Sequence, residues 1–259
     1  MTQFTYGLEI EVANLSIAGA ARAVTRAGIQ CVEPSTQHTT NANWKAVYDG
    51  TRGVSAEVVS PILTAERLNE TRTVTRALST AGATVNKTTG LHIHVGAASF
   101  GDDEAERLNA IANFVENWYA AHGAIGALVA PSRLNNGFCK ALDIASAAQL
   151  AERVRGGDIS NGGRGRYLSL NLDSFARHST VEVRLHHGTL NAAKITGWAD
   201  FITAMAEASK DGVNINTRLN DPADKVAAAA DLLGELTRYG YLASSVADYL
   251  NQRAAQLHA

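Results

Sequence analysis

The sequence predicts an α+β fold, in which a mainly antiparallel or mixed sheet is covered by helices on one face. Three observations lead to this prediction. Strand-like and helix-like segments are interleaved, several strand-like segments follow one another after short turns, and the last quarter of the chain is mostly helical. Short turns can join only antiparallel strands, because a parallel pair needs a crossover of about a dozen residues or more.

Four strand-like segments come first, with apolar residues at or near the two-residue period of a strand. They are residues 4–12, 30–34, 44–49 and 55–61. A helix is then expected from about Thr64 to Ala81, with Thr64 as its N-cap. The stretch "ATVNKTTGLHIHVG", residues 83–96, predicts a strand, a turn and a second strand.

The second half of the chain begins with a helix expected from about Asp103 to Ala121. Its beginning, "DDEAE", holds four acids, which the positive end of a helix dipole stabilises. Residues 156–165, "GGDISNGGRG", hold five glycines and are expected to form no regular structure. Two strands are predicted next, in "RYLSLNL" and "TVEVRLHHG".

The chain is expected to form a single catalytic domain over residues 1–259, because it shows no internal repeat and no low-complexity linker. From about Asn191 onward it is mostly helical, with a break at "NDPAD". Residues 191–259 are therefore predicted to be a helical C-terminal cap on the same domain.

Composition indicates a globular protein of the cytoplasm. The 259 residues carry a net charge of −2 and have a pI near 6.4, which argues against a nucleic-acid or anionic-membrane partner. No segment approaches the ~18 apolar residues of a membrane span, and the N-terminus lacks the features of a signal peptide. The two cysteines, Cys31 and Cys139, make no disulfide framework and fit a reducing compartment.

The predicted strands place polar residues on one face, since successive side chains of a strand alternate between its faces. In "YGLEIEV", Leu8, Ile10 and Val12 share one face, and Glu9 and Glu11 share the other. Acids, imidazoles and a guanidinium recur on the polar faces or at the ends of the other strands. These are Asp49, Glu57, His92, His94, Glu182, Arg184 and His186.

Each of these features alone is more often a solvated strand face, a surface histidine or a same-face ion pair. If they converge on one sheet, however, the carboxylates need protons, basic groups or metal ions to compensate their charge. Oxygen ligands with one or two imidazoles favour Mg²⁺ or Mn²⁺. Zinc is the competing ion, but the helical H-E-x-x-H arrangement is absent. Arg184 beside such ions would bind phosphate.

Five segments, in this order, resemble the amidoligase family, whose relatives are glutamine synthetase and glutamate–cysteine ligase. They are "FTYGLEIEV", "WKAVYDGTRGVSAEVVSPIL", "GLHIHVG", "RYLSLNL" and "TVEVRLHHGTLN". The likeness covers roughly residues 4 to 200, and "PSRLNNGFCKAL" is a further, less distinct element. It implies a glutamine synthetase-like catalytic fold: a curved, mainly antiparallel sheet with helices on its convex face. The concave face would bind ATP and two or three divalent ions.

The resemblance also assigns roles to single residues. Metal ligands in glutamine synthetase occur as an E-x-E pair, two acids eight residues apart, a histidine strand and an E-x-R strand. By this likeness one ion would be held by Glu9, His92 and Glu182, and the other by Glu11, Asp49 and Glu57. Asp49 stands where that enzyme has Glu, so its contact with the ion could be either direct or through water. The chain is much shorter than that enzyme, and a counterpart of its extra domain is not expected in it, so the oligomeric state stays open.

The nucleotide contacts implied by the resemblance involve four residues, Arg184, Arg166, Arg164 and His94. Arg184, Arg166 and Glu57 are the expected catalytic residues. The glycine-rich segment with Arg164 and Arg166 is expected either to close over the site and exclude water or to be simply a mobile hairpin loop.

The function predicted in this way is an ATP-dependent carboxylate–amine ligase that uses Mg²⁺ or Mn²⁺ and passes through an acyl phosphate. Its substrates would be small-molecule or peptide carboxylates and amines, whose identities the sequence leaves open. Two alternatives remain: a two-metal hydrolase that needs no nucleotide, and a non-catalytic metal- or nucleotide-binding module. The chain has neither a P-loop nor a G-x-S-x-G motif. Cys139 is a possible nucleophile, although a buried structural thiol is the commoner case.

Overall fold

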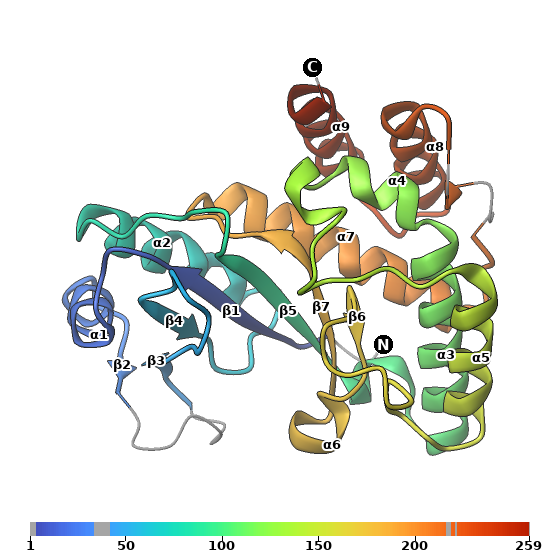
Figure 1. The fold of residues 1–259 in the computed structure, drawn as a ribbon, viewed down its shortest axis with the longest axis horizontal. Coiled ribbons are helices and arrows are strands. Elements are labelled where there is room, and N and C mark those ends of the chain that lie inside the picture. The colour runs from blue at the N-terminus through green and yellow to red at the C-terminus, as the bar shows by residue number, and fades with distance from the viewer. Residues whose placement is uncertain (1–3, 34–41, 216–218, 221, 259) are drawn as a thin grey trace. The chain divides into compact units, whose positions relative to one another are not determined.

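The computed structural model describes residues 4–33, 42–215, 219–220 and 222–258. They form two compact units, coloured along the chain in Figure 1. Of the described residues, those within 4–94 and 186–196 make up the strand-rich unit, and those within 95–185 and 197–258 make up the helix-rich unit. The single catalytic domain expected from the sequence stays a prediction.

The strand-rich unit is built on strands in the order β2-β3-β4-β1-β5. Their bounds are β1 Tyr6–Val12, β2 Cys31–Val32, β3 Trp44–Val47, β4 Ala56–Val59 and β5 Gly90–Gly96, of which β5 belongs to this unit up to His94. The pairs β1–β4 and β3–β4 are antiparallel, and β2–β3 is parallel. The predicted mainly antiparallel pairing is therefore confirmed for these strands.

Two helices pack in the same unit, α1 (Ile17–Arg26) and α2 (Glu70–Thr80). They contact each other, and α1 also contacts β3 and β4. The apolar side chains of β1 (Leu8, Ile10 and Val12) are fully buried. Burial of about three such side chains stabilises a fold by roughly 5–9 kcal/mol before entropy is counted. The opposite face of β1 is thereby left to its polar residues.

The helix-rich unit holds one antiparallel strand pair, β6 (Leu170–Asn171) with β7 (Thr180–His187), of which β7 belongs to this unit up to Leu185. Its helices are α3 Glu104–Ala120, α4 His122–Ala127, α5 Ile144–Arg155, α6 Phe175–His178, α7 Ala192–Lys210, α8 Lys225–Arg238 and α9 Ser244–His258. Helix α7 belongs to this unit from Gly197 onward. Short 3₁₀ helices are η1 Arg67–Asn69 in the strand-rich unit and η2 Ala97–Phe100 and η3 Pro131–Arg133 in this one.

An aromatic cluster forms the centre of the helix-rich unit. Trp118 of α3 meets Trp198 of α7 with ring centroids 6.1 Å apart, and Trp198 stacks on Phe201 at 5.3 Å. All three side chains are almost completely buried. Within the described residues, none of the helices combines the length and the apolar character that a membrane span requires.

The predicted helix 103–121 is confirmed as α3, and Asp103 caps it by accepting a hydrogen bond from the Glu106 amide at 2.8 Å. The helix expected from Thr64 starts later. The Thr64 carbonyl accepts bonds from the amides of Arg67 and Leu68, which makes a turn before η1, and α2 begins only at Glu70. Asn69, and not Thr64, is its N-cap.

Two further predictions need correction, and two helices were not predicted. Residues 83–87 form no strand beyond a bridge between Ala13 and Thr84, because the Asn86 side chain accepts bonds from the amides of Thr88 and Thr89 and so makes a turn. The segment "RYLSLNL" is a strand only at residues 170–171. Helices α1 and α5 lie in segments for which the sequence analysis made no prediction. Residue 34 of the predicted strand 30–34 and residue 221 of "NDPAD" lie outside the described part of the chain.

Candidate metal site

The pairing register of three strands brings the acids of the strand-rich unit together. Glu11 of β1 lies directly opposite Glu57 of β4, and Glu57 lies opposite Val47 of β3. Directly opposed residues of antiparallel strands project from the same face of a sheet. Glu9, two residues from Glu11, therefore shares this face, which is opposite the buried apolar face of β1.

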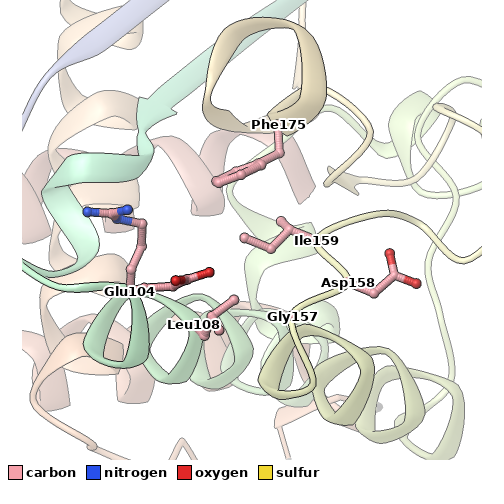
Figure 2. A pocket seen from close by; sticks show the side chains of 7 residues that line it. Glu104, Leu108, Gly157, Asp158, Ile159 and Phe175 are labelled. Carbon is pink, nitrogen blue, oxygen red and sulfur yellow. The ribbon is translucent and has the colours of Figure 1, made fainter.

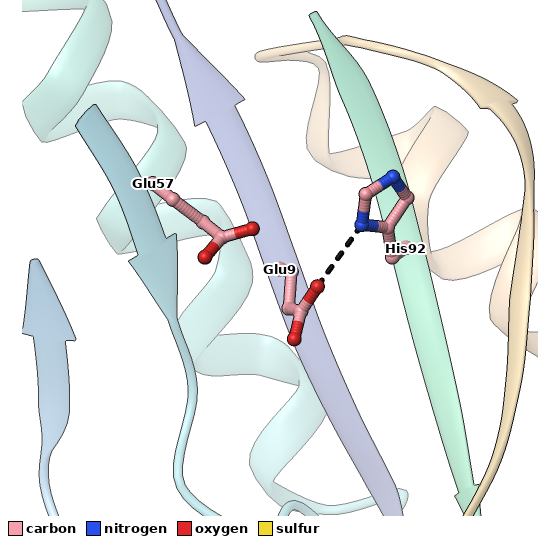
Figure 3. Close-up of side chains that lie close together, drawn as sticks. All are labelled: Glu9, Glu57 and His92. Atoms are coloured by element: carbon pink, nitrogen blue, oxygen red, sulfur yellow. Dashed lines mark hydrogen bonds and ion pairs between the residues drawn. The ribbon is translucent and has the colours of Figure 1, made fainter. Parts of the chain in front are cut away.

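His92 of β5 joins the acids of β1. Its Nδ1 lies 3.0 Å from Glu9 Oε2, the interaction drawn in Figure 3. Its Nε2 lies 3.6 Å from Glu11 Oε1, so one imidazole stands between two carboxylates. The second histidine of the strand, His94, places Nε2 3.1 Å from Glu9 Oε1. The predicted convergence of the E-x-E and histidine strands is present in the structure.

Two groups of side chains in this unit have the spacing of metal ligands. Glu9, Glu57 and His92 each offer a donor atom within 4.8 Å of the others, and so do Glu11, Asp49 and Glu57. Figure 3 shows Glu57 and Glu9 projecting from neighbouring strands toward the same region. Glu57 belongs to both groups. Carboxylate oxygens with one imidazole fit Mg²⁺ or Mn²⁺.

The charge state of Glu9 suits a metal ligand. Burial raises the pKa of this carboxyl, but the positive charge of His94 and hydrogen bonds from His92 and His94 outweigh it. The pKa of Glu9 therefore lies well below its ordinary value, and the group is ionised at neutral pH. Its side chain keeps 23% of its surface exposed, which leaves it accessible to an ion.

The remaining ligand candidates of this unit are held by backbone amides. Glu11 Oε2 accepts a hydrogen bond from the Gly90 amide at 2.6 Å, and its side chain is buried. Asp49 Oδ1 accepts one from the Thr51 amide at 2.7 Å in the turn after β3. These bonds orient the carboxylates and leave further oxygen lone pairs for an ion.

Lys45 is a residue of this face that the sequence analysis missed. It lies opposite Val59 on β3 and is only 7% exposed. Burial lowers its pKa, and the nearby charges of Glu9 and Glu57 partly offset this effect. The alternation in "WKAVYD" could have revealed it, since Lys45, Val47 and Asp49 fall on one face.

Glu182 and Arg184, the predicted E-x-R pair, lie on β7 in the helix-rich unit. Both are buried, and the Arg184 guanidinium donates to the Glu182 carboxylate. Glu182 Oε2 also accepts a hydrogen bond from Asn171 Nδ2 at 2.6 Å. The same-face ion pair weighed as an alternative is therefore present, and the role of Glu182 as a ligand beside Glu9 and His92 stays a prediction.

The glycine-rich segment, residues 156–165, is irregular, as predicted, and hydrogen bonds hold its residue Asn161 in place. Asn161 is fully buried, and its Nδ2 donates to Asn171 Oδ1 at 2.6 Å. Beyond it, Gly162, Gly163 and Gly165 adopt φ angles of +60° to +78°, a conformation that favours glycine. Arg164 and Arg166, the predicted nucleotide contacts of this segment, are exposed.

A pocket of about 410 Å³ lies beside the same segment in the helix-rich unit. Figure 2 shows Phe175, Ile159 and Leu108 around it, with the Glu104 carboxylate between them. None of the residues predicted for the site lines this pocket.

Both cysteines are buried free thiols. Cys139 Sγ donates to the Arg133 carbonyl at 3.3 Å, and burial raises its pKa despite the nearby charges of Arg133 and Arg184. Burial and the charge of Glu33 raise the pKa of Cys31 to about 12. Thiols in this state are poor nucleophiles, so the structure favours the structural role of Cys139.

Comparisons with known proteins identify a family and include a distant structural neighbour. Residues 2–206 match a family model described as "Putative amidoligase enzyme". No curated protein sequence matches the chain. The crystal structure of a bifunctional glutathione synthetase from Pasteurella multocida aligns with a TM-score of 0.46 and 11% identity, covering 98% of this chain. The alignment covers 47% of the synthetase, so this chain spans about half of its length.

Proposed function

The chain belongs to the amidoligase family, and from this premise we propose that it is an ATP-dependent carboxylate–amine ligase that forms an amide or isopeptide bond. The observation that carries the proposal is the pair of ligand groups on one sheet face, Glu9–Glu57–His92 and Glu11–Asp49–Glu57. A shared carboxylate between two groups suits two ions that act on one phosphate.

The residues that would hold the ions follow from these groups. Glu9, His92 and Glu57 would bind one ion, and Glu11, Asp49 and Glu57 would bind the other. When bound there, Mg²⁺ or Mn²⁺ would neutralise negative charge on the oxygens of the transferring phosphate. Ionised Glu9 and the amide-oriented Glu11 supply preformed negative charge, so little reorganisation is needed on binding.

In the first step, an oxygen of the substrate carboxylate attacks the γ-phosphorus of ATP. A new P–O bond forms, the bond to the β-phosphate oxygen breaks, and ADP leaves. Arg184 holds phosphate oxygens through its planar guanidinium. The ion pair with Glu182 supports this role, because it fixes the guanidinium in one orientation before ATP arrives.

In the second step, the amine nitrogen attacks the carbonyl carbon of the acyl phosphate. The C–N bond forms, phosphate leaves with the electrons of the C–O bond, and the nitrogen loses its proton to a base. Glu57, on the sheet face and partly exposed, is the expected catalytic carboxylate. Arg164 and Arg166, on the exposed part of the glycine-rich segment, would contact the nucleotide phosphates, as would His94, and shield the acyl phosphate from water.

The test is phosphate release from ATP and Mg²⁺ with a panel of carboxylates and amines. We expect release that requires both substrates and falls by about 100-fold or more in Glu9→Gln and Glu57→Gln. Glu66→Gln is the matched control, because Glu66 is exposed and its side chain makes no cap hydrogen bond. Hydrolysis of amides or phosphoesters without nucleotide would instead identify a two-metal hydrolase. Binding without any product would identify a non-catalytic module.

A further inference from the structure

An exposed aromatic pair lies in the helix-rich unit next to the E-x-R strand. Phe138 is 45% exposed and Tyr167 is 38% exposed. Their ring centroids are 5.4 Å apart, and the ring planes meet at 85°. Exposure of large aromatic side chains to water is unfavourable. Because the two rings bury each other only partly, the pair indicates a surface that binds a ligand.

Two arginines flank this pair. The guanidinium carbon of Arg166 lies 5.3 Å from the ring centroid of Tyr167, and that of Arg184 lies 6.0 Å from it. Arg184 Nε also donates to the Phe138 carbonyl at 3.4 Å. The aromatic strip, defined here as Phe138, Tyr167, Arg166 and Arg184, therefore joins apolar rings to positive charge.

The strip rests on hydrogen-bonded backbone. The Lys140 amide donates to the Tyr167 carbonyl at 2.8 Å, and the Ser169 amide donates to the Lys140 carbonyl at 2.8 Å. The Arg184 amide in turn donates to the Ser169 carbonyl at 2.9 Å. The segments that carry the two rings and Arg184 are thus linked to one another and to β7. A ligand would meet a preformed surface, which reduces the ordering cost of binding.

We propose that the aromatic strip binds the adenine base of ATP, with the base stacked on Tyr167 and Phe138 and the phosphates directed toward Arg184. This inference rests on the proposed function. Every nucleobase has a π-face that stacks on aromatic rings, and guanidinium groups bind phosphate. A nucleotide is a ligand that combines these two chemistries at short range.

Arg166 has a defined part in this proposal. Its exposed guanidinium lies over the Tyr167 ring, where a planar cation can occupy the place of a base. On nucleotide binding it would leave the ring and pair with a phosphate. Tyr167 would then act through its ring and not through its hydroxyl, so Tyr167→Phe should bind ATP as the wild type does.

The experiment compares two ligands by calorimetry, Mg·ATP and Mg·tripolyphosphate, since only the first has a base. We expect Tyr167→Ala and Tyr167→Leu to lose about 5- to 100-fold in affinity for ATP. Their affinity for tripolyphosphate should stay within about 2-fold of the wild-type value, because the phosphate contacts remain. Phe138→Ala should behave in the same way with a smaller loss.

Tyr239→Ala is the matched control, because Tyr239 is also exposed (54%) and also carries an arginine, Arg238, 4.9 Å from its ring. It should bind both ligands as the wild type does. Unchanged ATP affinity in Tyr167→Ala and Tyr167→Leu, or equal losses for both ligands, would overturn the base-stacking role and leave the ligase proposal intact. A wild-type protein that binds neither ligand would overturn both proposals.

Discussion

The charge of Glu9 is set by its immediate neighbours. Burial of most of this side chain, which is only 23% exposed, would by itself raise the pKa of its carboxyl. Two histidines, placed by the alternation of β5, reverse this effect and hold the pKa of Glu9 low. The same arrangement that ionises Glu9 without a metal leaves it ready to bind one.

Lys45 provides a first test at this scale. Its ammonium group supplies positive charge next to Glu9 and Glu57, so it stabilises the metal-free acids and opposes a divalent cation. We expect Lys45→Met to bind Mn²⁺ several-fold more tightly and to unfold at a lower temperature without metal. Thermal unfolding with and without Mn²⁺ measures both effects. Weaker Mn²⁺ binding in Lys45→Met would show that Lys45 supports the ion.

His122 in α4 provides a test of pH dependence. Burial, with a smaller contribution from Lys225, lowers its pKa to about 4. In the unfolded chain the pKa is about 6.5, so between these values only the unfolded state binds the proton. The free energy of unfolding should therefore fall as the pH falls from about 6.5, by about 2 kcal/mol at pH 5.

The measurement is urea unfolding of the wild type and His122→Gln at about pH 7 and pH 5. The variant lacks the titrating imidazole, so its stability should depend less on pH over this interval. Parallel pH profiles for the two proteins would mean that His122 is already protonated in the folded state at pH 5.

At the scale of elements, Asn161 connects the glycine-rich segment to β6 and β7. Its backbone amide donates to Asp173, its side chain donates to Asn171 and to the Gly165 carbonyl, and it accepts a bond from the Leu172 amide. Asn171 in turn donates to Glu182. Asn161 thus belongs to the same network as the E-x-R pair, whereas residues 163–166, which follow it, are exposed.

Asn161→Ala should therefore destabilise the protein by about 3 kcal/mol, because it leaves several buried groups without partners. It should also speed proteolysis within residues 156–166. Ser160→Ala is the control: Ser160 bonds to Asp158 and to the Gly162 amide near the surface, so its removal should cost at most about 1 kcal/mol. Similar losses in both variants, measured by urea unfolding, would contradict the anchoring role.

The elements that could be predicted from the sequence are those with a clear period. The strands β1, β5 and β7 alternate regularly, and α3 has an acidic cap. Helix α5 was missed although Asp143 caps it and Ala147, Leu150, Ala151 and Val154 form its buried stripe. The prediction of a strand at 83–87 was wrong because the Asn86 side chain bonds to nearby backbone amides and makes a turn. The periodicity of apolar residues does not indicate such local hydrogen bonds.

At the scale of the whole molecule, the sequence predicted which residues face the site but not their spacing. The alternation in single strands places Glu9, Glu57 and His92 on polar faces. Their meeting depends on the strand order β4-β1-β5, which no local pattern encodes. Lys45 was missed for the same reason. The pattern of "WKAVYD" predicts which face of the strand it lies on, but its approach to Glu9 follows only from the pairing of β3 with β4.

The central claim is that the sheet face of the strand-rich unit holds divalent ions through its acids and His92. The most direct measurement is an anomalous difference map from crystals grown with Mn²⁺ and ATP. The account predicts one peak at coordination distance from Glu9, Glu57 and His92 and another from Glu11, Asp49 and Glu57. A map in which Mn²⁺ binds elsewhere, with these side chains still paired only to one another, would contradict it.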